Sequence, residues 1–230
     1  YYQESLDLST KLNYNFGIAA SLNYLGMIYL NKGLFPEALE FFFKSLEVAE
    51  KYNIKKGMAA AMGNIGIIYE NEKDYNKALR YHFKSLKIEE ELGNLNGVAG
   101  SYNSIGSIYY FKNNSQKAIE YYNKALEVKR KMGDEEGCAS TLANIGNIYY
   151  SKGNYTLALK NYTASLKINE ILKNKKDIAG SYLNIGIIYY YQNNYSEALK
   201  NYYASLNLRE QIGDKEGIAN SYTNIGLVYD

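Results

Sequence analysis

The sequence predicts an all-α protein, a right-handed α-solenoid superhelix of antiparallel helical hairpins, on three observations. Four residue types recur every 40 positions along the whole chain. Apolar positions within each stretch of 40 follow helical spacing. The chain has a single proline, and its glycines fall at fixed places, which suits long helices. A period of this size indicates stacked supersecondary units that bury their apolar faces against their neighbours only.

The period is carried by a glycine column, a tyrosine column three residues later, an alanine column twelve later and a leucine column twenty later. The glycines are Gly26, Gly66, Gly106, Gly146, Gly186 and Gly226, and the tyrosines are Tyr29, Tyr69, Tyr109, Tyr149, Tyr189 and Tyr229. The alanines are Ala38, Ala78, Ala118, Ala158 and Ala198, and the leucines are Leu46, Leu86, Leu126, Leu166 and Leu206.

We expect one array over residues 1–230 that is cut from a longer protein. Residues 1–16 would be the second helix of a truncated repeat, and 217–230 a partial repeat. Full repeats are expected at 17–56, 57–96, 97–136, 137–176 and 177–216. The end helices would lack partners and expose apolar residues, so self-association through them is expected.

The first helix of the first full repeat is predicted over residues 17–30. There Leu22, Leu25, Gly26 and Tyr29 follow the i, i+3, i+4, i+7 spacing of an apolar stripe. Gly33 then suits a left-handed cap. Asn113 and other residues replace it in later repeats, and Asn also tolerates that conformation.

The second helix is predicted over about residues 35–51, with Pro36 near its start, where a missing N–H costs nothing. A glycine is then expected to open each following repeat, except that Asp177 stands at this place once and could cap the helix. Small residues such as Gly26 and Ala38 are expected where the two helices of a hairpin cross. Larger side chains there would overpack the crossing.

Composition excludes several function classes. The net charge is +2, from 26 basic and 24 acidic residues, so we expect neither nucleic acid nor an anionic membrane as partner. No apolar run is long enough for a spanning helix, so no membrane insertion of this segment is expected. The sequence does not identify the cellular compartment, although the cytoplasm is slightly favoured over the periplasm.

No catalytic, cofactor-binding or metal site is expected, and we predict that the chain is not an enzyme. His82, the single histidine, stands in a column of aromatic residues and is interpreted as a core residue. Cys138, the single cysteine, shares a column with Ile and Val and is interpreted as a small buried apolar residue. One His and one Cys cannot form the usual tetrahedral zinc site.

The repeat resembles the tetratricopeptide repeat in its residues Leu22, Leu25-Gly26, Tyr29, Ala38, Phe42 and Ser45. It departs from that family's pattern in having a period of 40 rather than 34 and Glu50 in place of the terminal proline. This longer form is similar to the repeats of kinesin light chains, of Pins-type adaptors and of bacterial Rap-type or sensor-associated regions. The resemblance implies that the first helices line a concave groove that binds peptide.

The predicted groove face carries an asparagine column and a tyrosine column. The first comprises Tyr24, Asn64, Asn144, Asn184 and Asn224, with Asn103 and Asn147 beside it, and the second includes Tyr110, Tyr150 and Tyr190. A carboxamide has donors and an acceptor, so it can pair with a peptide main chain. The alternative is that the Asn residues bond to the backbone of the adjacent repeat. The Tyr residues suit an interface, or alternatively pack between repeats. Few charges are expected on this face, namely Glu70 and Asp230.

We therefore predict a non-catalytic protein–protein interaction module that binds a peptide segment of a partner in its groove. The alternative is a sensory or regulatory repeat region of a larger signalling protein, such as a histidine kinase, a cyclase or a transcription regulator. The first places the partner in another chain, and the second places it in an output domain of the same chain.

Overall fold

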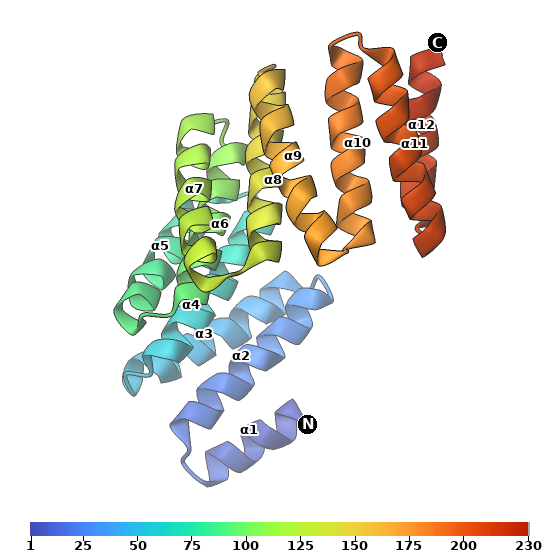
Figure 1. The fold of residues 1–230 in the computed structure, drawn as a ribbon. Helices are drawn as coiled ribbons and strands as arrows, with labels where there is room; N and C mark the ends of the chain where they lie inside the picture. Colours follow the sequence, from blue (N-terminus) through green and yellow to red (C-terminus); the bar gives the residue numbers. More distant parts are fainter. Residues whose placement is uncertain (230) are drawn as a thin grey trace. The chain divides into compact units, whose positions relative to one another are not determined.

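A computed structural model describes residues 1–229, and Asp230 lies outside the described residues. Within residues 1–229 there are twelve α-helices and no strand, so the predicted all-α repeat fold is confirmed (Figure 1). The helices are α1 (Tyr2–Lys11), α2 (Asn15–Asn31), α3 (Phe35–Lys51), α4 (Lys55–Asn71), α5 (Tyr75–Leu92), α6 (Leu95–Phe111), α7 (Ser115–Met132), α8 (Glu135–Ser151), α9 (Tyr155–Leu172), α10 (Lys175–Tyr191), α11 (Tyr195–Ile212) and α12 (Lys215–Tyr229).

The chain forms two compact units, residues 1–128 and residues from 129 onward, with the boundary inside α7. Each unit has its own core. One cluster of the first unit joins Phe42 and Leu46 of α3 to Ile65 and Ile68 of α4. A corresponding cluster of the second unit includes Tyr162 of α9 and Ile185 of α10. The expected single array over residues 1–230 stays a prediction.

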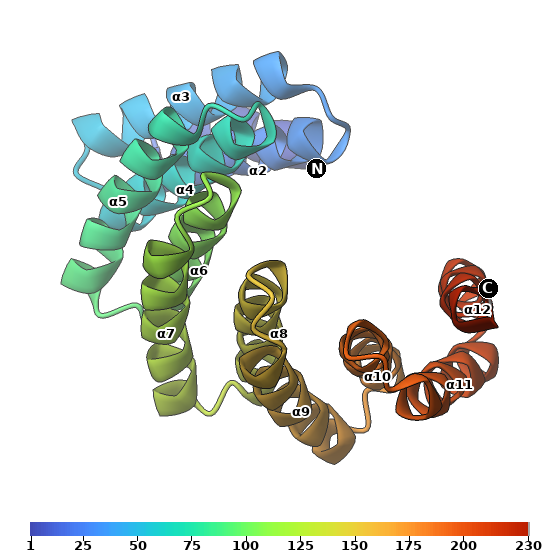
Figure 2. The same ribbon diagram turned by 90° about the horizontal axis from the view of Figure 1, so that it is seen from above.

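Within each unit, consecutive helices pair as hairpins. In the first unit α2 lies against α3 and α4 against α5, and in the second α8 lies against α9 and α10 against α11 (Figures 1 and 2). The expected close approach at the crossing is present: a Cβ placed on Gly186 would lie 2.6 Å from the Tyr202 ring and 3.2 Å from the Ala198 carbonyl oxygen. Gly26, Gly106, Gly146 and Gly186 thus each make room for a buried Phe or Tyr ring of the second helix.

A serine adds one polar bond to this crossing in three repeats. The buried hydroxyls of Ser45, Ser85 and Ser165 each donate to a first-helix carbonyl oxygen of the same hairpin, at 2.7–2.9 Å. The acceptors are the carbonyl oxygens of Ala19, Ala59 and Ala139.

The first helices begin two residues earlier than predicted, at Asn15 rather than Gly17 in the first repeat. The residues before them, such as Asn174, are the N-caps. Asp177 is therefore not the cap of α10, contrary to our expectation. Its backbone N–H donates to Asn174 Oδ1 at 3.3 Å, and its carboxylate accepts from Asn174 Nδ2 at 2.8 Å. Asp177 lies in the first turn, three residues after the cap, because a cap precedes the helix it closes.

The predicted left-handed positions after the first helices are confirmed. Gly33 has φ +74° and Gly153 has φ +69°. Asn113 and Asn193 adopt the same region, at φ +57° and +58°, as does Lys73 at +60°. These residues end one helix and turn the chain into the next, because the left-handed conformation closes the last helical turn.

The core assignments of His82 and Cys138 agree with the structure, in which both residues are only 3 % exposed. Burial lowers the pKa of His82 to about 4 and raises that of the Cys138 thiol. His82 Nε2 has no hydrogen-bond partner among the described residues and lies 3.9 Å from the Glu70 carboxylate. None of the described helices has the length and hydropathy required to cross a membrane.

Candidate functional site

The site predicted from sequence lies on α2, α4, α6, α8, α10 and α12, the first helices of the hairpins. Members of the asparagine column take up partly exposed positions, with Tyr24 at 46 % exposure and the four asparagines half-buried. Each can therefore be reached from solvent. They differ in what their side chains already bind.

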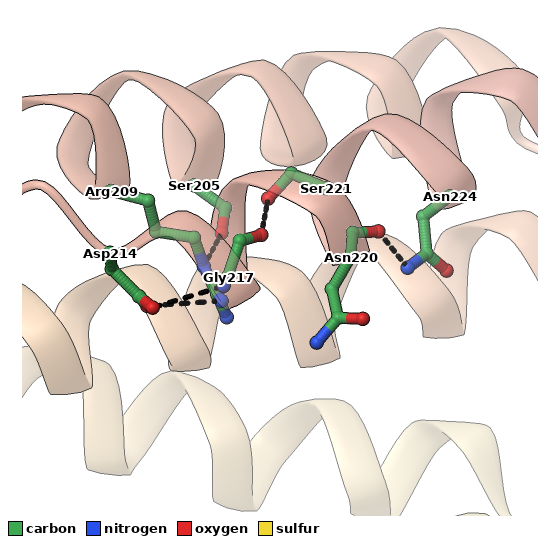
Figure 3. A network of polar contacts seen from close by, with 7 residues as sticks. All are labelled: Ser205, Arg209, Asp214, Gly217, Asn220, Ser221 and Asn224. Carbon is green, nitrogen blue, oxygen red and sulfur yellow. Dashed lines mark hydrogen bonds and ion pairs between the residues drawn. The ribbon is translucent and has the colours of Figure 1, made fainter.

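Two of the four asparagines have partners within the protein. Asn64 Nδ2 donates to Asn23 Oδ1 of the preceding repeat at 3.0 Å. Asn224 Nδ2 donates to the Asn220 carbonyl oxygen of its own helix at 2.8 Å (Figure 3). The alternative of a bond between repeats thus describes Asn64, although its acceptor is a side chain rather than backbone.

Asn144 and Asn184 make no side-chain hydrogen bond to any other described residue. Both line one hollow of about 310 Å³ in the second unit, between α8 and α10 with α9 beneath. The other residues lining this hollow are Glu136, Ser140, Ala143, Ser165, Asn169, Asp177, Gly180 and Ser181. Its walls thus present two carboxylates, three carboxamides and three hydroxyls.

The first unit has a hollow in the same register with a different lining. It lies between α2 and α4, has a volume of about 140 Å³, and is lined mostly by apolar groups, including Phe16, Ala20, Tyr24 and Ile54. Tyr24 is also stacked on Tyr2, with ring centroids 4.9 Å apart. Equivalent positions of the repeat therefore form one apolar and one polar hollow.

The remaining predicted residues are placed as follows. Asn147 accepts a hydrogen bond from the Tyr162 hydroxyl at 2.7 Å and so joins α8 to α9. Asn103 is half-buried, and its Oδ1 has no partner among the described residues. Asn147 thus has a structural contact that the sequence did not indicate.

Residues of the tyrosine column contact other aromatic rings near the turns. The Tyr150 ring lies 5.7 Å from that of Tyr191, and Tyr190 lies 5.8 Å from Tyr195, at the start of the next helix. Tyr110 contacts its neighbour Phe111 at 5.7 Å. Burial, followed by a hydrogen bond to Tyr191, raises the pKa of Tyr150. The packing alternative thus has direct support for Tyr150, whose ring contacts the next repeat.

Asn169 of α9 was missed by sequence analysis. It is only 4 % exposed, lines the polar hollow, and its Oδ1 has no hydrogen-bond partner within residues 1–229. Its column reads Ala49, Glu89, Lys129, Asn169 and Arg209. The side chains of this column vary in length and charge although the position faces the next repeat, and that variation was the signal in the sequence. It was missed because the repeat was identified from positions that stay constant.

No cluster of His, Cys, Asp and Glu suited to a metal ion occurs within residues 1–229. Glu70, one of the two charges expected on the first-helix face, is half-buried. Burial raises its pKa, while the hydrogen bond that it accepts from Ser107, 3.0 Å long, acts in the opposite direction. The second expected charge, Asp230, is outside the described part of the chain.

Comparison with solved structures finds the same fold at low sequence identity. BtubC (BKLC) from P. vanneervenii has a TM-score of 0.82 at 20% identity, over 92% of this chain and 89% of that chain. A STAND protein with a tetratricopeptide repeat sensor from Pyrococcus horikoshii has a TM-score of 0.84 at 23% identity, over 99% of this chain and 34% of that chain. Aspartyl phosphate phosphatase F from Bacillus subtilis has a TM-score of 0.85 at 16% identity, over 97% of this chain and 59% of that chain. This chain thus spans about a third of the second protein and three fifths of the third. Among curated proteins, no sequence is significantly similar to it.

Sequence-family models agree with the repeat described above. Tetratricopeptide repeat models match residues 18–53, 57–131, 137–211 and 177–230. These matches include most of the chain. The chain therefore belongs to the tetratricopeptide repeat family.

Proposed function

We propose that this chain is a non-catalytic module that binds a peptide segment of a partner protein across its first helices, with Asn144 and Asn184 contacting the peptide main chain. The observation that carries the proposal is the state of these two carboxamides. They are half-exposed, they lack internal side-chain partners among the described residues, and they line the same hollow. A carboxamide can donate to a peptide carbonyl and accept from its N–H without reading the side chains.

The other candidate residues have different parts in this proposal. Asn64 and Asn224 would have to exchange an internal hydrogen bond for one to peptide, so their net contribution to affinity is smaller. Tyr24, Tyr110, Tyr150 and Tyr190 are partly exposed rings that can contact peptide side chains, with Asn103 and Asn147 beside them. The second unit is therefore the principal binding region.

The test begins with selection of binding sequences from a random peptide display library on the wild-type chain. The best peptide is then titrated by calorimetry against wild type and the double variant Asn144→Ala, Asn184→Ala. Loss of two hydrogen bonds of about 0.5–1.5 kcal/mol each weakens binding about tenfold, with little change in melting temperature.

The matched control is Asn64→Ala, from the same column. Because Asn64 bonds to Asn23, this variant should lose about 0.5–1.5 kcal/mol of stability and little affinity. If the Asn144, Asn184 double variant instead melts several degrees lower and binds the peptide normally, the two residues are structural and the proposal is wrong.

A regulatory role is the second candidate, and the comparisons favour it. Three of the similar structures are described as a STAND protein with a repeat sensor, an aspartyl phosphate phosphatase and the quorum sensor NprR. In each, this chain corresponds to only part of the protein, 34%, 59% and 64%. Reading the gene on both sides of this segment, and measuring whether peptide alters the activity of an adjoining output domain, tests this role.

A further inference from the structure

The column of Asn169 carries a cationic side chain in both neighbouring repeats. In the preceding repeat Lys129 Nζ donates to the Gly137 carbonyl oxygen at 3.2 Å and to Thr141 Oγ1 at 2.9 Å. The lysine of the second helix thus reaches over the first turns of the next first helix. Burial lowers the pKa of Lys129, because it disfavours the charged ammonium, whereas the nearby Asp134 acts in the opposite direction.

The following repeat fills the same place with a guanidinium. Arg209 Nε donates to Ser205 Oγ at 3.1 Å, and Nη1 lies 3.4 Å from Asp214 Oδ2 (Figure 3). The side chain lies so close to Gly217 that a Cβ added to that glycine would collide with it. Gly217 stands one period after position 177, as Gly137 stands one period before it.

The junction between α9 and α10, which lies between these two repeat junctions, has no cationic side chain at this position. The Asn169 side chain makes no hydrogen bond to α10 among the described residues. The hollow of about 310 Å³ is lined by Asp177 and Ser181, the counterparts of the residues that Lys129 contacts in the preceding repeat. The buried Asn169 Oδ1 has no hydrogen-bond partner in the described part of the chain. Asp177 replaces the glycine of the other repeats, and Glu136 stands opposite on α8 without an ion pair among the described residues.

We infer that this hollow is a subsite for a lysine or arginine side chain of the bound peptide. The two carboxylates attract a cation, and Asn169 Oδ1 and the Ser181 oxygen are acceptors for its N–H groups. An anion would meet the same carboxylates and is repelled. The inference rests on the proposed function, since the peptide delivers the cation while Asn144 and Asn184 hold its main chain. Asn144 lies about two helical turns from Glu136 on α8, and Asn184 about two turns from Asp177 on α10.

The first arm of the test uses peptides selected from a display library on the wild-type chain. They should share a Lys or Arg, and exchanging that residue for citrulline or norleucine should weaken binding about tenfold. Glu136→Gln should cause a similar loss. The variant Asn169→Lys supplies its own ammonium, as Lys129 does one repeat earlier, so it should melt higher than wild type and lose the preference for a basic residue. Asn169→Leu, which removes the amide without adding a cation, should also bind these peptides more weakly.

The second arm does not depend on peptide binding. Butylguanidinium and butylammonium ions are titrated with NMR detection, with neutral butylurea as control. The two cations should shift the amide signals of Asn169, Gly180 and Ser181 in wild type, and not in Asn169→Lys. If peptides bind without any basic preference and the cations shift nothing, the subsite is wrong while the proposed function stands. If no peptide is selected but the cations bind, the proposed function fails and the cation site remains.

Discussion

Gly186 tests the packing of the hairpin crossing, with Gly180 of the same helix as its control. A Cβ on Gly186 would lie 2.6 Å from the Tyr202 ring, so the ring has to move by about 0.8 Å to reach an ordinary contact of 3.4 Å. Tyr202 is 1 % exposed and packs against Ala198, Leu206 and Ile225, which leave it no space for that movement. Outside its own helical turns, Gly180 has no described atom within 4 Å of an added Cβ.

The two variants separate helix propensity from overpacking. Both replacements gain about 0.5–1 kcal/mol because alanine is the better helix former. Gly186→Ala also suffers overpacking, typically about 1–3 kcal/mol, so it should end about 1–3 kcal/mol less stable than Gly180→Ala. The difference in stability between the two variants isolates the cost of overpacking, because the gain in helix propensity is common to both and cancels.

Urea unfolding followed by circular dichroism measures this difference. The midpoints of the variants are compared with that of wild type at constant slope, because a changed slope signals a changed unfolding reaction. Equal stability of Gly186→Ala and Gly180→Ala would refute the reasoning, since it would show that the Tyr202 ring can yield without cost.

Three further predictions concern the core and the chain ends. Wild type should lose up to about 3 kcal/mol of stability as the pH falls from 6.5 towards 4, because the folded-state pKa of His82 is about 4 and the unfolded chain binds the proton first. His82→Phe should remove this loss and keep or raise stability at pH 7, and a variant that retains the full pH dependence in urea melts would contradict the assignment. Cys138 is buried with a raised thiol pKa, so it should react with a thiol reagent only as fast as the protein opens, whereas rapid labelling without urea would show it to be accessible. Leu8 and Leu227 are 58 % and 50 % exposed on the end helices, so charge at both positions should reduce self-association in sedimentation, and an unchanged sedimentation coefficient would exclude this surface.

The fold was predictable from the sequence because its signals repeat. The second helix at Phe35–Lys51 and the left-handed residue Gly33 agree with expectation, since each has local causes in Pro36, apolar spacing and glycine. The starts of the first helices were predicted less accurately. The glycine at position 17 lies within the first turn, where it makes room for Ser9 and Tyr14 rather than opening the helix.

The candidate site was predictable only in part. Spacing identified the column of Asn144 and Asn184, but it could not show that Asn64 already bonds to Asn23. That bond depends on how closely α2 and α4 approach. Asn169 could not be identified from the sequence, because its importance lies in the hollow that its short side chain leaves unfilled. That hollow is recognised only by comparison with Lys129 and Arg209, which stand at the same position of the neighbouring repeats.

The variable second-helix column has a consequence for how such a protein can acquire new specificity. A single codon change from Lys to Asn at such a position would vacate one hollow, and the reverse change would fill it. Because each repeat contacts its neighbours only, the effect stays at one junction and the rest of the stack keeps its fold. Repeats of this kind can therefore diversify their ligand preferences one junction at a time, by mutations that the helices themselves tolerate.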